Sequence, residues 1–234
     1  MNEAAKTPSN KSSGSVKRPE RKYIMTDRQI IISIGRECGS GGHEIGEKLA
    51  AYYGIKLYDR NLIELLAQKK GKNPDDLAKM EEKVKTGIFP VRRNGFAEKT
   101  GEIMNKMTES DKMYLMERDL ILDLAGKESF VIIGRAANAI LADHPNTLRL
   151  YVYASESFKI PRVKEFYHLN SDTEARKKME QIDKIRQNYF NYYSDMAWGS
   201  SDGHDFMIDT SVFGIDGAVD IIIDIANRKF RKPA

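Results

Sequence analysis

The sequence predicts an α/β fold with one parallel sheet of five strands, helices between the strands, and a helical insertion. Apolar, β-branched runs at 30–35, 130–134, 148–153 and 205–209 are typical of buried strands, and 55–58 is a shorter fifth run. Helical patterns alternate with these runs, and this alternation favours parallel strands joined by right-handed crossovers. A glycine-rich turn after the first run marks a candidate binding site in this fold.

This turn lies between the first strand and the first helix. Four isoleucines fall within residues 30–34, and glycine-rich sequence follows at 35–46. Apolar residues then recur at helical spacing until Gly54, which ends the helix. Glycine lets backbone N–H groups approach a phosphate, and the unpaired amides of a first helical turn add positive potential. We therefore predict an anion site here; a glycine turn without a ligand is the alternative.

The turn departs from the usual phosphate-binding pattern, which is G-x-x-x-x-G-K-[ST]. When Gly39 and Gly41 are aligned with that pattern, Gly42 takes the place of the lysine. His43 takes the place of the residue whose hydroxyl usually binds Mg²⁺. Arg36 stands where the first glycine would stand, and it is the nearest replacement for the missing positive charge.

Asp59 and Arg60 follow the short second strand, at the sheet edge where open parallel sheets bind ligands. Asp59 is interpreted either as the N-cap of the next helix or as a substrate-binding residue. The two roles are compatible with each other.

Residues 68–125 differ in character from the rest of the chain. They are charged, they contain scattered glycines and prolines, and no strand pattern is evident. A helix is expected after Asn73, and a long apolar-faced helix is expected from about 98 to 125. We interpret the segment as a helical insertion that covers the substrate; an ordinary helical subdomain is the alternative. Arg92 and Arg93 are more typical of solvated surface than of a ligand site.

Arginines recur at the same sheet edge and in a basic helical region, 155–192, which is expected to act as a lid. The strand at 130–134 is followed by Gly-Arg, so Arg135 emerges beside the glycine-rich turn, where a guanidinium can bind phosphate bidentately. Arg162 and Arg186 lie in the lid region. Arginines on a mobile lid neutralise a transferring phosphoryl group, although a solvated basic face is the alternative.

The basic excess of the chain lies in residues 1–28. They carry seven Lys or Arg and three Asp or Glu, so their net charge equals the +4 of the whole chain of 234 residues. With almost no apolar content, this segment is expected to be disordered. A single domain is expected at 29–228, followed by a short C-terminal tail at 229–234. Because residues 29–234 together carry no net charge, nucleic-acid binding is not favoured, and a weak contact through the basic tail is the alternative.

Composition also bears on location. No apolar run approaches the ~20 residues needed to span a bilayer, and the N-terminus lacks the apolar core of a signal peptide. Cys38 is the only cysteine, so no internal disulfide is possible. We therefore expect a cytoplasmic protein without a membrane partner. Cys38 is interpreted as an inert small residue, with a reactive thiol as the alternative.

Five motifs together resemble the cytidylate kinase-like family, relatives of bacterial cytidylate kinase within the nucleoside monophosphate kinases. The motifs are Gly-Arg-Glu-Cys-Gly-Ser-Gly-Gly-His at 35–43, Tyr-Asp-Arg at 58–60, Ile-Gly-Arg at 133–135, Asp-Lys-Ile-Arg at 183–186, and Asp-Thr-Ser-x-x-Gly-Ile-Asp-Gly-Ala at 209–218. The resemblance runs from about residue 29 to 226. The Gly-Ser-Gly-Gly loop and the Asp-Thr-Ser stretch are its most specific parts.

The resemblance implies a P-loop NTPase-type three-layer sandwich with a five-stranded parallel sheet, a substrate-binding insertion and a short arginine lid. It implies transfer of the γ-phosphoryl group of ATP, with Mg²⁺, to a nucleoside monophosphate or a similar small acceptor. The phosphate loop of the family is matched by Gly39, Ser40, Gly41, Gly42 and His43.

The same match implies further site residues. Asp59, with Arg60 beside it, matches an acceptor-side position near the end of the second strand. Arg135 matches the arginine of the Gly-Arg-Asp element of cytidylate kinases, where it would bind substrate. Arg162 and Arg186 match arginines of the lid.

Two departures from the family pattern bear on activity. Ala136 takes the place of the Asp of Gly-Arg-Asp, which affects cytidine recognition, and Gly42 takes the place of the lysine. Arg36, Arg135 or a lid arginine would have to supply the missing charge, because phosphoryl transfer depends mostly on positioning and charge neutralisation. Three functions are therefore open: an ATP-dependent kinase, which we favour, a nucleotide-binding regulatory protein with little catalysis, and a nucleic-acid-binding protein.

Overall fold

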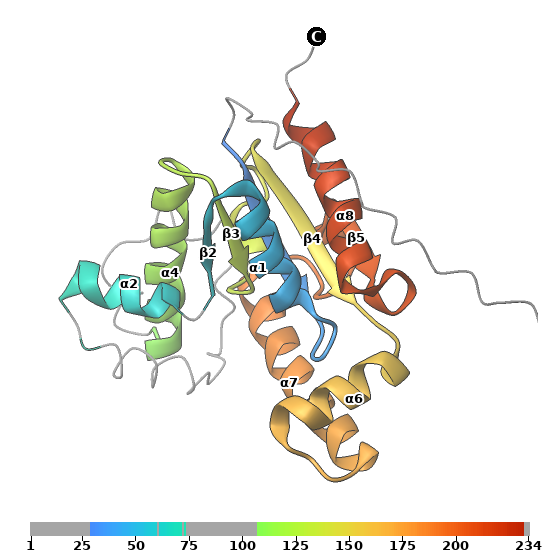
Figure 1. The fold of residues 1–234 in the computed structure, drawn as a ribbon. Coiled ribbons are helices and arrows are strands. Elements are labelled where there is room, and N and C mark those ends of the chain that lie inside the picture. The colour runs from blue at the N-terminus through green and yellow to red at the C-terminus, as the bar shows by residue number, and fades with distance from the viewer. Residues whose placement is uncertain (1–28, 60, 72, 74–106, 232–234) are drawn as a thin grey trace, which may run out of the picture.

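The computed structural model describes residues 29–59, 61–71, 73 and 107–231. At its centre is a sheet of five strands in the order β2-β3-β1-β4-β5, and every pairing is parallel (Figure 1). The prediction of five parallel strands is confirmed. The strands are β1 (Ile31–Arg36), β2 (Lys56–Tyr58), β3 (Phe130–Ile133), β4 (Thr147–Tyr153) and β5 (Phe206–Asp209).

Two helices cover one face of the sheet, α1 (Gly42–Tyr53) and α8 (Thr210–Phe230) (Figure 1). Ile32 of β1 lies in one buried cluster with Leu49 of α1 and Ile222 of α8. Because side chains alternate along a strand, the neighbours of Ile32 point to the other face. The run of isoleucines therefore serves two cores at once.

The second face is covered by α2 (Asn61–Lys70), α4 (Glu109–Ala125) and the short α5 (Ala137–Ile140). Ile31 of β1 packs there in a cluster with Ile121 of α4. Helices on both faces make the predicted three-layer sandwich. No helix within the described ranges is long and apolar enough to cross a membrane.

The predicted lid region consists of two helices, α6 (Glu156–Tyr167) and α7 (Asp172–Tyr193), which lie together beyond the carboxyl ends of the strands (Figure 1). His168, with a φ of 54°, ends α6 and separates the two helices. The last turn of α7 returns to the core, where Tyr193 stacks on Tyr114 of α4 with ring centroids 4.0 Å apart. A short 3₁₀ turn, η2 (Ser201–Gly203), then leads to β5.

Three boundaries differ from the sequence-based expectation. Helix α4 begins at Glu109 and not near 98, because Thr108 and Asp111 form a capping box that starts the helix there. Since α4 packs on the sheet, it belongs to the core and not to an insertion. Helix α8 begins at Thr210 and continues to Phe230, whose buried ring keeps two residues of the expected tail in the helix.

The remaining part of the expected insertion, at 72 and 74–106, lies outside the described residues, as does the expected disordered tail at 1–28. The helix expected after Asn73 and the surface arginines at 92 and 93 fall there as well.

Candidate functional site

The loop that follows β1 turns sharply into α1, as the sequence predicts for a phosphate loop. Gly39 and Gly41 have φ values of 80° and 83°, in the left-handed region that favours glycine. Gly41 is the N-cap of α1, and no side chain caps the helix there. A Cβ atom on Gly41 would collide with the side chain of Ile215 from α8. The loop conformation therefore requires glycine at this position.

Several loop amides are available to a ligand. In the part of the chain that the structure describes, the amides of Gly39, Gly41, Gly42 and His43 donate to no protein acceptor. The Ser40 hydroxyl instead donates to a backbone oxygen of the same loop, and its side chain is fully buried. A helix N-terminus with converging, unpaired amides favours an anion. The geometry of the loop is thus compatible with the predicted anion site, and Ser40 contributes to the shape of the loop.

Arg36 lies at the centre of a group of positive charges. Arg186 of α7 donates from Nη1 to the backbone oxygen of Arg36 at 3.3 Å and to Oδ1 of Asp183 at 3.2 Å. Burial, together with the charges of Arg186 and Arg135, lowers the pKa of Arg36 to about 9, against the opposing effect of Asp59. Arg36 therefore stays protonated at neutral pH, and the repulsion among these cations is relieved when an anion lies between them.

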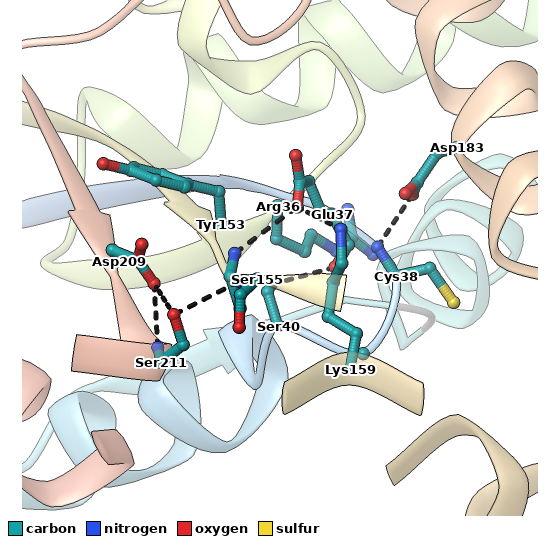
Figure 2. A network of polar contacts seen from close by, with 12 residues as sticks. Arg36, Glu37, Cys38, Ser40, Tyr153, Ser155, Lys159, Asp183, Asp209 and Ser211 are labelled. Carbon is teal, nitrogen blue, oxygen red and sulfur yellow. Dashed lines mark hydrogen bonds and ion pairs between the residues drawn. The ribbon is translucent and has the colours of Figure 1, made fainter. Parts of the chain in front are cut away.

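Helix α6 holds the loop from the other side. Arg162 donates from Nε to the backbone oxygen of Gly39 at 3.1 Å and forms an ion pair with Glu44. Lys159, one turn earlier, places Nζ 2.7 Å from Oε2 of Glu37 (Figure 2). Sequence analysis missed the Lys159–Glu37 pair, although Lys159 precedes the predicted lid arginine by three positions. Arg162 and Lys159 therefore hold helix α6 of the predicted lid region against the phosphate loop and the residue Glu37 before it.

A cavity of about 830 Å³ opens beside the loop, within the range of small-molecule sites. It brings together most of the predicted site residues. Those that line it are Arg36, Gly39, Gly41, Gly42, His43, Asp59, Arg162 and Arg186.

Arg135 does not line this cavity. Its Nη1 lies 3.1 Å from Oε1 of Glu117 on α4, and the exposed fractions of the two side chains are 9% and 1%. Tyr189 of α7 donates to the other carboxylate oxygen at 3.0 Å, and burial followed by the charge of Glu117 raises the pKa of that phenol. Arg135 is thus held between α4 and α7. Sequence analysis missed Glu117 because its position in the fold depends on the start of α4.

Asp59 lies at the carboxyl end of β2, as predicted, and its carboxylate faces the cavity. Oδ2 lies 3.0 Å from Nδ1 of His43, and Oδ1 lies 3.9 Å from Nη2 of Arg36. Among the described contacts, this carboxylate has none with the first turn of α2. These contacts favour the substrate-side interpretation of Asp59 over the cap interpretation. Arg60 lies outside the described residues.

The Asp-Thr-Ser stretch at the end of β5 supports the loop from behind. The Thr210 hydroxyl donates to the backbone oxygen of Ser40 at 2.8 Å. Asp209 accepts from the Ser211 amide at 2.8 Å, and Ser211 in turn accepts from the amide of Ser155, which stands before α6 (Figure 2). This motif therefore connects the loop, the sheet and the lid.

Cys38 is a buried part of the same assembly. Its side chain is 5% exposed and packs with Ile160, Val163 and Met179 of the lid helices. Burial raises the pKa of the thiol, so the thiol stays protonated at neutral pH. The structure agrees with the expectation of an inert packing residue.

Comparison with known proteins gives one family. The model of the cytidylate kinase-like family matches residues 31–212, which confirms the resemblance drawn from the motifs. No curated protein sequence matches the chain.

Solved structures are also similar. A crystal structure of an uncharacterized protein from Eubacterium ventriosum ATCC 27560 shares 30% sequence identity, with a TM-score of 0.64, over 85% of this chain and 99% of that one. Shikimate kinase from Acinetobacter baumannii in complex with shikimate matches with 14% identity and a TM-score of 0.49, over 87% and 96% of the two chains. A gluconokinase from Sinorhizobium meliloti 1021 matches with 14% identity and a TM-score of 0.43, over 87% and 93%.

Proposed function

This chain belongs to the cytidylate kinase-like family, and on that premise we propose that it is an ATP-dependent phosphotransferase. It transfers the γ-phosphoryl group of ATP to a nucleoside monophosphate or a similar small acceptor that binds in the cavity. A cytoplasmic location is part of the proposal, because ATP is available there and the chain has a single, buried cysteine.

The observation that carries the proposal is the packing of Arg36 on Gly42. A Cβ atom on Gly42 would lie 2.6 Å from Cβ of Arg36, so the stem of the arginine fills the space that a side chain at this position would need. Arg36 also lines the cavity, and this supports our assignment of Arg36 as the replacement for the missing lysine. Arg36 is the cation that would contact the transferred phosphate.

The protein's contribution to the reaction is positioning and neutralisation of charge. The amides of Gly39, Gly41, Gly42 and His43 would hold the terminal phosphates of the nucleotide. Arg162 and Arg186, in their proposed catalytic role, would reach the developing charge from the lid. Arg135 would act from behind Arg36, where its charge adds to the local positive potential.

Mg²⁺ is part of the proposal, and the donor set of the site is compatible with a magnesium ion that enters with ATP. Magnesium keeps several of its waters and is commonly held by substrate phosphates with one or two carboxylates. The described residues contain no cluster of three or more potential ligands that would form a cage. Glu37 and Glu44, on either side of the phosphate loop, and Asp59, at the end of β2, are carboxylates of the cavity lining. When bound, the metal would neutralise charge on the phosphates.

A nucleotide-binding regulatory protein with little catalysis is the second candidate, and Gly42 in the place of the lysine favours it. Two measurements separate the two functions: ATP affinity by calorimetry and ADP release over a panel of acceptors. The kinase proposal expects micromolar to millimolar ATP binding and acceptor-dependent ADP release. ATP binding without ADP release for any acceptor would leave the regulatory function, and absence of ATP binding would exclude the ATP-dependent kinase.

Nucleic-acid binding is the third function, and the balanced charge of residues 29–234 does not favour it. A salt-dependent gel shift that persists after deletion of residues 1–28 would support it.

A further inference from the structure

Helix α7 contacts both the cavity and the core through one face. Arg186 lines the cavity, and its Nη1 donates to the backbone oxygen of Arg36 at 3.3 Å. Tyr189 and Tyr193 follow Arg186 by three and seven positions. Residues at this spacing lie on the same side of a helix. The face of α7 that carries the cavity arginine therefore also carries the two tyrosines.

Both tyrosines donate hydrogen bonds to buried carboxylates of α4. The Tyr189 hydroxyl lies 3.0 Å from Oε2 of Glu117, and the Tyr193 hydroxyl lies 3.1 Å from Oδ1 of Asp111. The two carboxylate side chains belong to residues that are 1% and 4% exposed. Hydrogen bonds to a charged acceptor away from water are strong and directional. They therefore hold this half of α7 at a defined place on α4.

The two carboxylates are themselves fixed in position. Glu117 forms its ion pair with Arg135 at 3.1 Å, and Arg135 follows strand β3. Asp111 belongs to the capping box of α4, where it accepts from the Thr108 amide at 2.9 Å. Since α4 also packs on the sheet, the contacts of the tyrosines connect α7 to a rigid frame.

The guanidinium of Arg186 depends on the placement of its own helix turn. Its Nη1 is shared between the backbone oxygen of Arg36 and Oδ1 of Asp183, and the side chain is 28% exposed. Stabilisation of charge on a phosphoryl group falls with distance, and a misplacement of about 1 Å can cost about 10²-fold in rate. Tyr189 is about 4.5 Å along the helix axis from Arg186, whereas Tyr193 is about 10.5 Å away.

We infer, as an extension of the proposed function and resting on it, that Tyr189 is a positioning residue for Arg186. The hydrogen bond from its phenol to Glu117 fixes the turn of α7 that carries Arg186, so the guanidinium lies at the cavity before a nucleotide binds. Tyr189 acts through Arg186 and touches no reacting atom. Tyr193 holds the end of the helix and contributes to stability.

The test compares Tyr189→Phe with Tyr193→Phe. Both variants keep the aromatic ring and remove a hydroxyl that donates to a buried carboxylate of α4 at almost the same distance, so each is a matched control for the other. Each is made alone and together with Arg186→Ala. With Mg²⁺ present, we measure ADP release from ATP, with water and with a panel of acceptors. We also measure the affinity for ADP plus aluminium fluoride, which mimics the transferring phosphoryl group, beside the affinity for ADP alone.

Arg186→Ala should lower kcat and the affinity for ADP plus aluminium fluoride by about 10²- to 10³-fold. Tyr189→Phe should lower both by roughly tenfold, with the KM for ATP and the affinity for ADP alone unchanged. Tyr193→Phe should match the wild type in all of these quantities. Adding Tyr189→Phe to Arg186→Ala should have no further effect, because the group that Tyr189 positions is then absent. Both tyrosine variants should lower Tm by a similar amount, since each loses one buried hydrogen bond.

A purely structural role of Tyr189 gives different results. The two tyrosine variants would then have the same kcat and the same affinities, or the loss in Tyr189→Phe would add in full to that in Arg186→Ala. Either result would overturn the inference, although the wild-type protein still binds ATP. Failure of the wild-type protein to bind ATP, or to bind ADP more tightly with aluminium fluoride, would instead remove the proposed function and the inference with it, so the two failures are distinguishable.

Discussion

The carboxylate of Asp183 accepts a 2.8 Å hydrogen bond from the backbone amide of Cys38, so helix α7 occupies the amide just before the phosphate loop (Figure 2). Burial raises the pKa of Asp183, although Arg186 and the Cys38 amide act in the opposite direction. A negative charge is therefore placed next to a site that is built to bind an anion.

The variant Asp183→Asn keeps an oxygen acceptor for the Cys38 amide and removes this charge. We expect ATP affinity to rise by about fivefold, equivalent to roughly 1 kcal/mol. Calorimetry measures the change, and equal or weaker ATP binding in the variant would contradict the expectation.

The same shift predicts a dependence of stability on pH. A carboxyl group whose pKa is raised on folding binds more protons in the folded protein than in the unfolded chain. The free energy of unfolding contributed by Asp183 therefore falls as pH rises above the ordinary pKa of an aspartate. Asp183→Asn should gain in Tm over the wild type near pH 7 and lose this advantage toward pH 4, which thermal unfolding at the two pH values measures.

Arg36→Ala should weaken ATP binding by roughly ten- to a hundredfold, because a charge-assisted contact is worth about 1.5–3 kcal/mol. Arg176→Ala is the matched control, since Arg176 is a lid arginine that pairs with Glu156 on the surface and does not line the cavity. Calorimetric titration with ATP measures the affinity of both variants, and Arg176→Ala should bind ATP as the wild type does. Equal ATP affinity in Arg36→Ala and the wild type would show that the phosphates bind elsewhere.

Arg135→Ala should act mainly on stability. It leaves the Glu117 carboxylate buried without its ion-pair partner, and breaking a buried pair costs about 3–5 kcal/mol. Arg118→Ala, which removes an exposed pair with Asp119 on the same helix, should cost less than about 1 kcal/mol. Denaturant unfolding measures both values, and a cost for Arg135→Ala as small as that of the control would refute the buried-pair assignment.

Gly41→Val should abolish ATP binding and lower the free energy of unfolding, because the new side chain must displace Ile215 and adopt a φ of 83°. The variant Gly54→Ala separates the effect of backbone strain from the effect of the collision with Ile215. Gly54 has a φ of 63° with no atom within 4 Å of its added Cβ, so this variant carries backbone strain alone, at about 1 kcal/mol, and should bind ATP normally. Loss of ATP binding in both variants would point to general instability.

Deletion of residues 1–25 should leave Tm unchanged, because this segment is basic and contains few apolar residues for a core. Thermal unfolding of the shortened chain, beside the full chain, measures the difference. A drop of many degrees would show that the N-terminal segment packs on the domain.

Sequence reasoning was effective where the physical signal is local. The isoleucines of β1, the glycines after it and the spacing in α1 are adjacent in the chain, so they predict a strand, a turn and a helix without knowledge of the rest. The same holds for Asp59 and Arg135 at the ends of their strands, whose place at one sheet edge follows from parallel topology.

The contacts that decide the chemistry are long-range, and the sequence does not display them. Glu117 reaches Arg135 only because the Thr108 cap fixes the start of α4. Lys159 reaches Glu37 over 122 positions because α6 lies across the loop. The orientation of Arg135 toward α4 and away from the cavity depends on the packing of α4 and α7 around it. A pattern of residue types could not indicate it.

The hydrogen bond from Thr210 to the carbonyl of Ser40 fixes the shape of the loop from within the core, where Thr210 is fully buried. A loop held in this way has little conformational entropy left to lose when a nucleotide arrives. Nucleotide association would then require little rearrangement of the loop, and its rate would be limited by diffusion and increased by the arginine charges. The residence time of the nucleotide would depend on how long α6 and α7 stay in contact with the loop.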